Sequence, residues 1–403
     1  MTEIGEYTEF DKNFVKKHAL ETLEFYIPQC MDEQKGGFYQ TFHRDGTVHD
    51  NTKKDLIGTA RFLIDFSLVE LMTGENKYDS YIEHGLDFLL KTHEDQKYGG
   101  FFQTVIGKDP VRDEDKRAYS HAFVLLAFSK VFEAGFKRAK PNISRVFNLM
   151  EDTFWEERFN LYATQTSRDL SQLSSYRGQN PNMHMVESLI AAYEATENEK
   201  YIKRAMKVAK QVTGELANEC GGLIWEHYTS NWDIDQNYNK DDPENIYRPF
   251  GFLPGHLLEW AKLLLVLERY QSEDWLKEKS VELYRKAIEH GWDEERKGFN
   301  YTFDFERTVL NQDRYYWVHA EAVAVSFLLW ARTGNDKYLD WYEEFWNYSL
   351  NNLVDNENCG WYRVVSPEGT PYEQNKSIPG KTDYHPINAC YEVHRTFKES
   401  IEN

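Results

Sequence analysis

The sequence predicts an all-α protein, a closed (α/α)6 barrel of six helical hairpins with short β-like turns at one end. A short segment that joins glycine or asparagine to aromatic residues recurs about every 60 residues, and such a fixed spacing is typical of repeated structural units. Each recurrence separates two segments whose apolar residues follow the helical period. The six recurrences begin at Gly36, Gly99, Asn160, Gly221, Gly298 and Gly360.

Segments with helical period follow one another along the chain, two for each repeat. They lie near residues 10–29, 55–72, 78–92, 118–134, 142–151, 182–195, 199–217, 253–270, 275–290, 317–332, 336–353 and 384–400. The second segment of each pair carries few charges, whereas the first is rich in Lys, Arg and Glu, which predicts an inner ring of buried helices and an outer ring. Neither end shows a polar capping unit, so we expect residues 1–403 to close into one barrel domain.

Composition narrows the class of partner. A formal net charge of -20, spread along the chain, argues against binding to nucleic acid or to an anionic membrane surface. No stretch approaches the roughly 18 apolar residues of a membrane helix, and the N-terminus lacks a targeting pattern, so we expect a cytoplasmic protein. The 4 cysteines form no CxxC pair, which predicts neither a zinc site nor a disulfide framework. The expected partner is a small neutral molecule.

The first turns of the predicted inner helices contain polar residues of the types that enzymes use in catalysis. These turns all open at the same end of a barrel, so their side chains are expected to meet in one cavity. A single histidine on a helix is more often a structural hydrogen-bonding group, but repetition at equivalent positions indicates a chemical site. The residues are Arg61, Tyr119, His121, Asn182, His184, Glu187, His256, Glu259, Trp317, His319, Glu321 and His385.

Two His-x-x-Glu pairs stand out among these residues. Pro254 begins a helix just ahead of His256, and the spacing places His256 and Glu259 on one helix face, where the carboxylate orients the imidazole. His184 and Glu187 repeat this spacing. Helical bundles bind metals through Glu-x-x-His, but the order here is reversed and paired glutamates on neighbouring helices are lacking, so we expect no metal.

Longer motifs surround the same residues: Ala60 to Ser67, Tyr119 to Phe123, Asn182 to Glu187, Gly255 to Glu259, Trp317 to Glu321 and Asp383 to His385. On these motifs the whole chain resembles the N-acylglucosamine 2-epimerase superfamily. The resemblance implies an (α/α)6 barrel, no cofactor, proton transfer through a cis-enediolate, and possible assembly as a homodimer. It also implies that His385 is the base at C2 of the sugar, that His256 assists ring opening or handles the proton on the other face, and that Arg61 stabilises the oxyanion. Residues implied to bind the substrate or tune the histidines are Tyr119, Asn182, His184, Glu187, Glu259, Trp317 and Glu321.

Within the superfamily, the insertion Trp232 to Pro243 and the stretch Arg248 to Trp260 resemble the mannose isomerase branch, whereas Lys54 to Arg61 and Trp317 to Val323 resemble epimerases. We expect isomerisation of D-mannose to D-fructose. The alternative is a 2-epimerase acting on D-mannose and D-glucose, on cellobiose or on an N-acylglucosamine. An inverting glycoside hydrolase built on the glutamates and a non-catalytic sugar-binding protein are further alternatives.

Two expectations concern the neighbourhood of this site. The polar insertion between Trp225 and Arg248 lies just ahead of His256, so it is either a lid over the site or a surface excursion. Three arginines, Arg61, Arg177 and Arg248, would together hold an anionic group, which keeps a sulfonated sugar among the alternatives.

Overall fold

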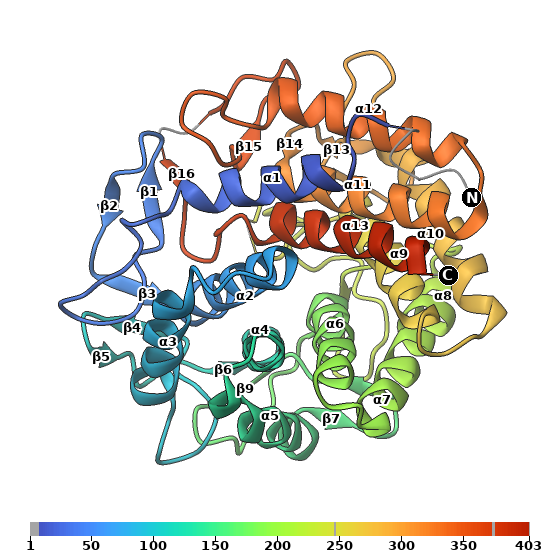
Figure 1. Ribbon diagram of the computed structural model, residues 1–403. Coiled ribbons are helices and arrows are strands. Elements are labelled where there is room, and N and C mark those ends of the chain that lie inside the picture. The colour runs from blue at the N-terminus through green and yellow to red at the C-terminus, as the bar shows by residue number, and fades with distance from the viewer. Residues whose placement is uncertain (1–7, 246, 373–374, 403) are drawn as a thin grey trace.

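The computed structural model describes residues 8–245, 247–372 and 375–402, and these form two concentric rings of helices (Figure 1). The inner ring contains α2 (Leu56–Thr73), α4 (Ala118–Glu133), α6 (Gln179–Thr196), α9 (Pro254–Glu268), α11 (Tyr316–Thr333) and α13 (Tyr384–Glu402). The outer ring contains α1 (Lys12–Glu24), α3 (Asp79–Phe88), α5 (Lys140–Thr153), α7 (Glu199–Lys210), α10 (Asp274–Gly291) and α12 (Lys337–Asn352). Short helices η2 (Leu89–His93), η3 (Lys137–Ala139), η4 (Gln211–Leu216) and α8 (Ala217–Glu219) complete the described helical segments. All twelve predicted helical segments are confirmed.

The inner ring is closed. Each inner helix packs against two others, and the last one, α13, contacts both α11 and the first inner helix, α2. The N-terminal helix α1 covers the seam, because it packs against α13 and α2 together. The prediction of an (α/α)6 barrel is therefore confirmed, and an open stack of hairpins is excluded. None of the described helices is long and apolar enough to cross a membrane.

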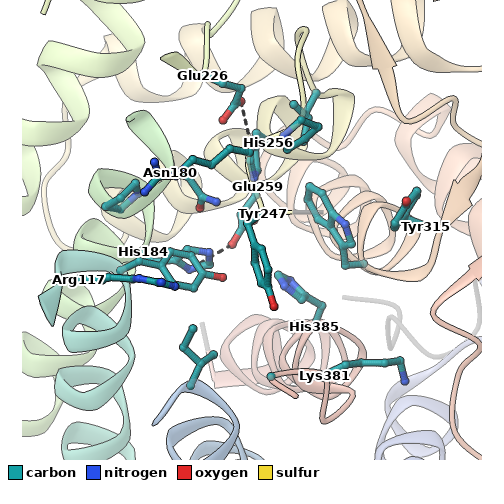
Figure 2. Close-up of a pocket in the computed structure, with 18 of the residues that line it drawn as sticks. Arg117, Asn180, His184, Glu226, Tyr247, His256, Glu259, Tyr315, Lys381 and His385 are labelled. Carbon is teal, nitrogen blue, oxygen red and sulfur yellow. Dashed lines mark hydrogen bonds and ion pairs between the residues drawn. The ribbon is translucent and has the colours of Figure 1, made fainter. Parts of the chain in front are cut away.

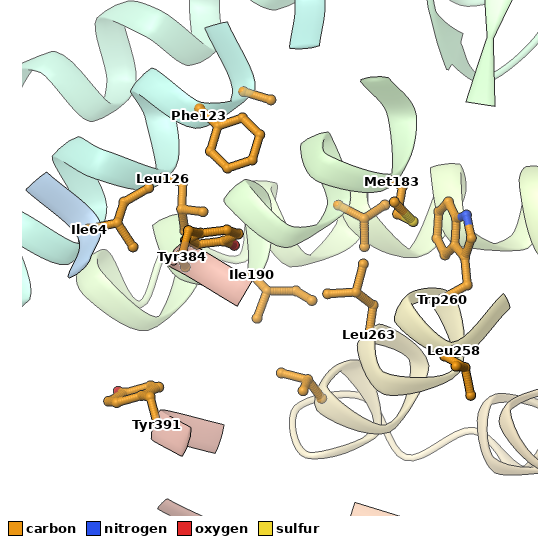
Figure 3. Packing of buried hydrophobic residues seen from close by; sticks show 14 of the residues in the cluster. Ile64, Phe123, Leu126, Met183, Ile190, Leu258, Trp260, Leu263, Tyr384 and Tyr391 are labelled. Carbon is orange, nitrogen blue, oxygen red and sulfur yellow. The ribbon is translucent and has the colours of Figure 1, made fainter. Parts of the chain in front are cut away.

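The two rings differ in burial as their charge patterns predict. In α9 every residue from Pro254 to Leu267 is buried, whereas α7 buries only one stripe, which contains Tyr201, Ala205 and Val208. Such a stripe follows the helical period and leaves the opposite face to solvent. Inside the barrel, apolar side chains from the inner helices meet around the axis, among them Leu126, Ile190 and Leu263 (Figure 3).

Short antiparallel strands gather at one end of the barrel. They pair as β16-β1-β2, β3-β4-β5, β6-β9, β7-β8, β10-β11, β12-β13 and β14-β15. Their bounds are β1 (Thr41–His43), β2 (Val48–Asp50), β3 (Lys53–Asp55), β4 (Thr104–Ile106), β5 (Asp109–Pro110), β6 (Lys116–Arg117), β7 (Trp155–Glu156), β8 (Leu161–Tyr162), β9 (Gln165–Thr166), β10 (Arg177–Gly178), β11 (His227–Tyr228), β12 (Thr302–Phe303), β13 (Val309–Asn311), β14 (Arg314–Tyr315), β15 (Val364–Val365) and β16 (Asn375–Ser377). Four of them, β3, β6, β10 and β14, end one residue before an inner helix begins, so this end also carries the first turns of those helices.

An ion pair recurs with the repeat and attaches five of the six glycine-aromatic turns to the next strand. Asp32 precedes the turn at Gly36; its Oδ1 accepts the backbone N–H of Lys35, and its Oδ2 lies 2.6 Å from Nζ of Lys54. The φ of Gly37 is 71°, and a Cβ there would lie 2.6 Å from the ring of Phe88, so the turn requires glycine. Equivalent pairs join Asp95 to Lys116, Glu156 to Arg177, Asp293 to Arg314 and Asp355 to Lys376.

Candidate active site

The first turns of the inner helices surround a cavity of about 290 Å³ at the strand-bearing end of the barrel (Figure 2). This volume is close to the lower end of the usual range for small-molecule sites, roughly 300–1,000 Å³. Seven of the site residues predicted from the sequence line the cavity, so the expectation of one shared cavity is confirmed for them. They are Arg61, Tyr119, His184, His256, Glu259, Trp317 and His385.

His385 lies in the first turn of α13 and is held by a carboxylate on the neighbouring inner helix. Its Nδ1 lies 2.8 Å from Oε1 of Glu321, which is fully buried and does not line the cavity. Because the carboxylate of Glu321 accepts a hydrogen bond here, the imidazole carries its hydrogen on Nδ1 and keeps a lone pair on Nε2. Burial, followed by the charge of Arg61, lowers the pKa of His385 well below its ordinary value, so the ring is uncharged at neutral pH.

His256 is held by a residue that the sequence did not single out. Its Nδ1 lies 2.7 Å from Oε1 of Glu226, so the prediction that Glu259 orients His256 is wrong (Figure 2). Gln179, the first residue of α6, donates a hydrogen bond from Nε2 to Oε2 of Glu226 at 2.9 Å. Trp260 in turn donates its indole N–H to Oε1 of Gln179 at 2.7 Å. Glu226 directly follows the glycine-aromatic segment of the fourth repeat, and that position was the only sequence signal for it.

His184 and Glu187 form the hydrogen-bonded pair that their spacing predicts, with 2.9 Å between Nδ1 and Oε2. Glu187 itself lies behind the cavity wall, where Tyr384 and Asn388 also donate hydrogen bonds to it. Burial opposes its ionisation, but the hydrogen bond from His184 and nearby positive charge lower the pKa of Glu187 to about 2. Glu259 lies near the same nitrogen of His184, at 3.7 Å from Nδ1, and burial with the charge of a neighbouring glutamate raises the pKa of Glu259 well above its ordinary value. Two carboxyl groups thus lie near Nδ1 of His184, and Glu187 is the one that accepts its hydrogen bond.

Arg61 supplies positive charge to the cavity wall. Its guanidinium donates hydrogen bonds to the carbonyl oxygen of Gly380 at 2.7 Å and to the hydroxyl of Tyr119 at 3.1 Å. It also lies 4.4 Å from the ring centroid of Phe123 and 5.0 Å from that of Tyr384. Within the described ranges it forms no ion pair with a carboxylate, so its charge is available to an anionic group on a ligand.

Three polar side chains in these first turns serve the fold instead of the cavity. Oδ1 of Asn182 accepts the backbone N–H of Tyr162 at 2.8 Å, and its Nδ2 donates to the main chain, so the predicted contact with substrate is absent from the cavity lining. His121 and His319 do the same in other repeats: Nε2 of each accepts a backbone N–H at 3.1 Å. These residues therefore hold the glycine-aromatic turns against the inner helices.

Other residues of the cavity wall were not predicted. Asn180 lies in the first turn of α6, and its Oδ1 has no hydrogen-bond partner within the part of the chain that the structure describes. Tyr247 is 70% exposed yet lines the cavity, because the insertion carries it over the mouth (Figure 2). Trp317, which was predicted, packs between the two principal histidines, with ring centroids 5.1 Å from His256 and 5.6 Å from His385.

The insertion is attached to the barrel by Arg248. This guanidinium donates to the hydroxyl of Tyr238 at 2.8 Å, inside the insertion. It also lies 4.1 Å from the ring centroid of Tyr176, which precedes β10 and belongs to the barrel. Arg177 instead forms a two-pronged ion pair with Glu156, at 2.7 and 2.8 Å, and does not line the cavity. The expectation that Arg61, Arg177 and Arg248 together hold an anionic group is therefore wrong.

Two groups of buried residues bring potential metal ligands within 4.8 Å of one another. One contains His184, Glu187 and Glu259, and the other Glu259, Glu321 and His385. The ammonium of Lys262 lies 2.6 Å from Oε2 of Glu321, and hydrogen-bond donors already serve Glu187. We therefore interpret these groups as the support of the histidines and identify none of them as metal ligands.

Comparison with known proteins agrees with this geometry. The family model described as N-acylglucosamine 2-epimerase (GlcNAc 2-epimerase) matches residues 37–389. A D-mannose isomerase from Marinomonas mediterranea is 39% identical over 97% of this chain and 99% of its own length. A cellobiose 2-epimerase from Eubacterium cellulosolvens is 25% identical over 96% of this chain and 98% of its own.

Among solved structures, a crystal structure of D-mannose isomerase superposes with a TM-score of 0.93 at 39% identity, covering 97% of this chain and 100% of that one. Both the sequence match and the shared barrel extend over nearly the whole chain. The chain therefore belongs to the N-acylglucosamine 2-epimerase family.

Proposed function

We propose that the protein is an aldose–ketose isomerase that converts D-mannose to D-fructose through a cis-enediolate. One observation carries the proposal: two histidines line a single cavity, each with Nδ1 on a buried carboxylate, and a guanidinium lies on the same wall. The names of the relatives at 39% identity support the choice of mannose and of isomerisation. The histidines are His385 and His256, and the guanidinium belongs to Arg61.

In the first half of the proposed reaction, Nε2 of His385 removes the proton from C2 of the open-chain aldose. The electron pair of the broken C–H bond forms the C1–C2 double bond, and negative charge develops on O1. Protonated His256 donates a proton to O1, while Arg61 stabilises the developing charge. This step requires a base whose conjugate acid is acidic enough to return the proton, next to a fixed positive charge.

In the second half, His256 removes the proton from O2, and the enediol collapses to a C2 ketone. His385 returns its proton to C1, so one proton has moved from C2 to C1 and one from O2 to O1. Both histidines end in their starting states, and no redox partner is needed. We further propose that Tyr119, His184, Glu259 and Trp317 bind the hydroxyl groups and ring of the sugar, since they line the same cavity.

Glu187 and Glu321 take a different part in this proposal. Both lie outside the cavity lining and bond to a histidine, so they tune and orient His184 and His385 and do not touch the sugar. Asn182 is not proposed to bind substrate, because its side chain bonds to the main chain and does not line the cavity. A small neutral sugar as partner, a cytoplasmic location and a homodimer stay predictions of the sequence.

The glutamates do not favour a glycoside hydrolase. Inverting hydrolases separate their two carboxyl groups by roughly 6.5–9.5 Å, to leave room for water. Here Glu259 has an oxygen within 4.8 Å of one on Glu187 and of one on Glu321, and both neighbours are bonded to a histidine. A non-catalytic sugar-binding protein has no use for two histidines mounted on carboxylates.

The proposal is tested by incubating the purified protein with D-mannose and following the products by NMR. Fructose as the first product supports the isomerase. Glucose as the first product supports the 2-epimerase, which uses the same groups but returns the proton to the opposite face of C2. If the protein binds sugar but leaves mannose, cellobiose and N-acylglucosamine all unchanged, both enzyme hypotheses are wrong and the protein is a sugar-binding protein.

A further inference from the structure

The two histidines of the cavity rest on carboxylates with different charge partners. Glu321 uses Oε1 to accept from Nδ1 of His385 at 2.8 Å, and its Oε2 lies 2.6 Å from the ammonium of Lys262. The negative charge that supports His385 is therefore already neutralised by a cation. A neutralised carboxylate stabilises an imidazolium less than a free one does.

The support of His256 lacks such a cation. Glu226 accepts from Nδ1 of His256 at 2.7 Å, and its other side-chain partner is the uncharged amide of Gln179, at 2.9 and 3.1 Å. Within the described ranges, Glu226 forms no ion pair with a lysine or an arginine. The full negative charge of this carboxylate thus acts on His256.

Lys262 lies on α9, nearly two turns beyond His256, and does not line the main cavity. Burial opposes its charge, but the charges of Glu321, Glu259 and Glu187 raise the pKa of Lys262, so the side chain is an ammonium ion. It does not line the cavity, so it does not touch the substrate. It acts on His385 through its contact with Glu321 and through its own charge, which opposes a charge on the imidazole. The proposed chemistry makes no direct use of it.

We infer that Lys262 is a positioning residue that decides which of the two histidines is the base. Its ammonium neutralises Glu321, so His385 stays uncharged and accepts the C2 proton, whereas Glu226, which has no such cation beside it, holds His256 as the group that donates to O1. The inference rests on the proposed isomerisation and adds the group that distinguishes the two histidines within it.

Charged and titratable groups face His385 from several inner helices, and Lys262 acts among them. They are Arg61 on α2, His184 and Glu187 on α6, Glu259 and Lys262 on α9, and Tyr316 and Glu321 on α11. Arg61 disfavours a charge on His385 as Lys262 does, but it lines the cavity and is proposed to bind substrate. Removal of Lys262 therefore changes the electrostatic environment of His385 without removing a proposed substrate contact.

The first test is the pH profile of kcat/KM for Lys262→Met. Without the ammonium, the hydrogen-bonded pair of His385 and Glu321 takes up a proton at higher pH. A proton on His385 removes the base, and a proton on Glu321 removes the acceptor that orients it. The acidic limb of the profile is expected to move to higher pH by about one to two units, as the loss of a charge two contacts away implies. Lys262→Arg, which keeps the charge, is expected to restore the limb.

Lys130→Met is the matched control. Lys130 is also a buried lysine inside the barrel, but it lies 2.8 Å from both Glu133 and Glu194 and contacts neither histidine pair. This variant is expected to lose stability while its pH profile keeps the position of the wild type. An unmoved acidic limb in Lys262→Met, or an equal shift in Lys130→Met, would overturn the inference while leaving the isomerase proposal intact.

A second test needs neither activity nor a folded lysine variant. The protein is labelled with ¹⁵N-histidine, and the ring nitrogens of His385 and His256 are assigned with the variants His385→Asn and His256→Asn. At neutral pH His385 is expected to show the uncharged ring with hydrogen on Nδ1. A charged His385 at neutral pH would overturn the inference whatever the substrate proves to be.

Discussion

Glu226 lies 2.7 Å from Nδ1 of His256, although the two are 30 residues apart, whereas Glu259, three residues from His256, turns toward His184. The loop residue thus holds the ring, and the helix residue faces the cavity. The hydrogen bond fixes the hydrogen on Nδ1 and aims the other nitrogen at a ligand, as carboxylate partners of catalytic histidines do.

Replacement of Glu226 by Gln is therefore expected to lower kcat by about 10–100-fold, because the amide neither carries the charge nor fixes the imidazole in one tautomer. Steady-state kinetics with D-mannose would measure the loss. Glu219→Gln, a change at the exposed end of α8 ahead of the same loop, is the control and is expected to leave kcat unchanged. Wild-type kinetics in Glu226→Gln would show that His256 needs no carboxylate.

Replacement of His385 by Asn is expected to lower kcat by about a thousandfold, in the range typical of a lost general base. His319→Asn is its matched control. His319 bonds to one backbone N–H and one backbone carbonyl oxygen, and Asn182 makes the same two contacts at the equivalent position of another repeat. Asparagine can therefore replace histidine at position 319. We expect His319→Asn to keep kcat within about twofold and to lose about 1–2 kcal/mol through the smaller side chain. Activity retained in His385→Asn would remove this residue from the base role.

Gly255 is closely packed beneath an aromatic ring of the site. A Cβ at this position would lie 2.4 Å from the indole of Trp317, which packs between the two histidines. Gly255→Ala is therefore expected to displace the ring and lower kcat/KM by about tenfold, since small displacements at a reacting site are costly. In Gly214→Ala, where nothing lies within 4 Å, kinetics should match the wild type. Equal kinetics in both variants would show that Trp317 does not position the substrate.

The repeated ion pairs give a pH dependence of stability. Burial opposes the ionisation of Asp95, but hydrogen bonds from Arg168, the backbone of Lys97 and Lys116 lower its pKa to about 2. Because the folded pKa lies below the ordinary value of 3.8, this stabilisation is present above about pH 4 and is lost as the pH falls through 2. Asp95→Asn is expected to cost about 3 kcal/mol at pH 7, since it leaves buried Lys116 without its partner.

Thermal unfolding of Asp95→Asn and wild type between pH 7 and pH 2 would check this prediction. The difference in Tm should shrink as the wild-type carboxylate is protonated. Asp109→Asn, in an exposed position on β5, should give no difference at any pH. A difference for Asp95→Asn that stays constant down to pH 2 would assign the loss to packing instead of charge.

Much of this architecture could be predicted because it follows local rules. Helical period, the spacing of the glycine-aromatic segments and the contrast in charge identified both rings. The contact between His184 and Glu187 was predictable because residues three apart on a helix are neighbours. The common opening of the inner helices placed Arg61, His256 and His385 in one cavity.

The remaining features depend on the path of the chain between helices, which period and spacing do not encode. One such feature is the loop that brings Glu226 into contact with His256, and another is the position of Tyr247 over the cavity. Asn182 and His319 were expected in the site but do not line the cavity. At equivalent positions of a repeat, a polar side chain can either face the cavity or bond to the main chain of a glycine-aromatic turn. The structure distinguishes these two roles by the contacts with the main chain, which the sequence does not show.

Turnover of D-mannose in D2O would show whether His385 moves a proton between C2 and C1. Because the proton on His385 exchanges with solvent before it returns to C1, we expect fructose that carries deuterium at one of its two C1 positions, and no labelling by His385→Asn. Fructose formed without deuterium would indicate a hydride shift instead of proton transfer, and glucose deuterated at C2 would indicate an epimerase instead of an isomerase.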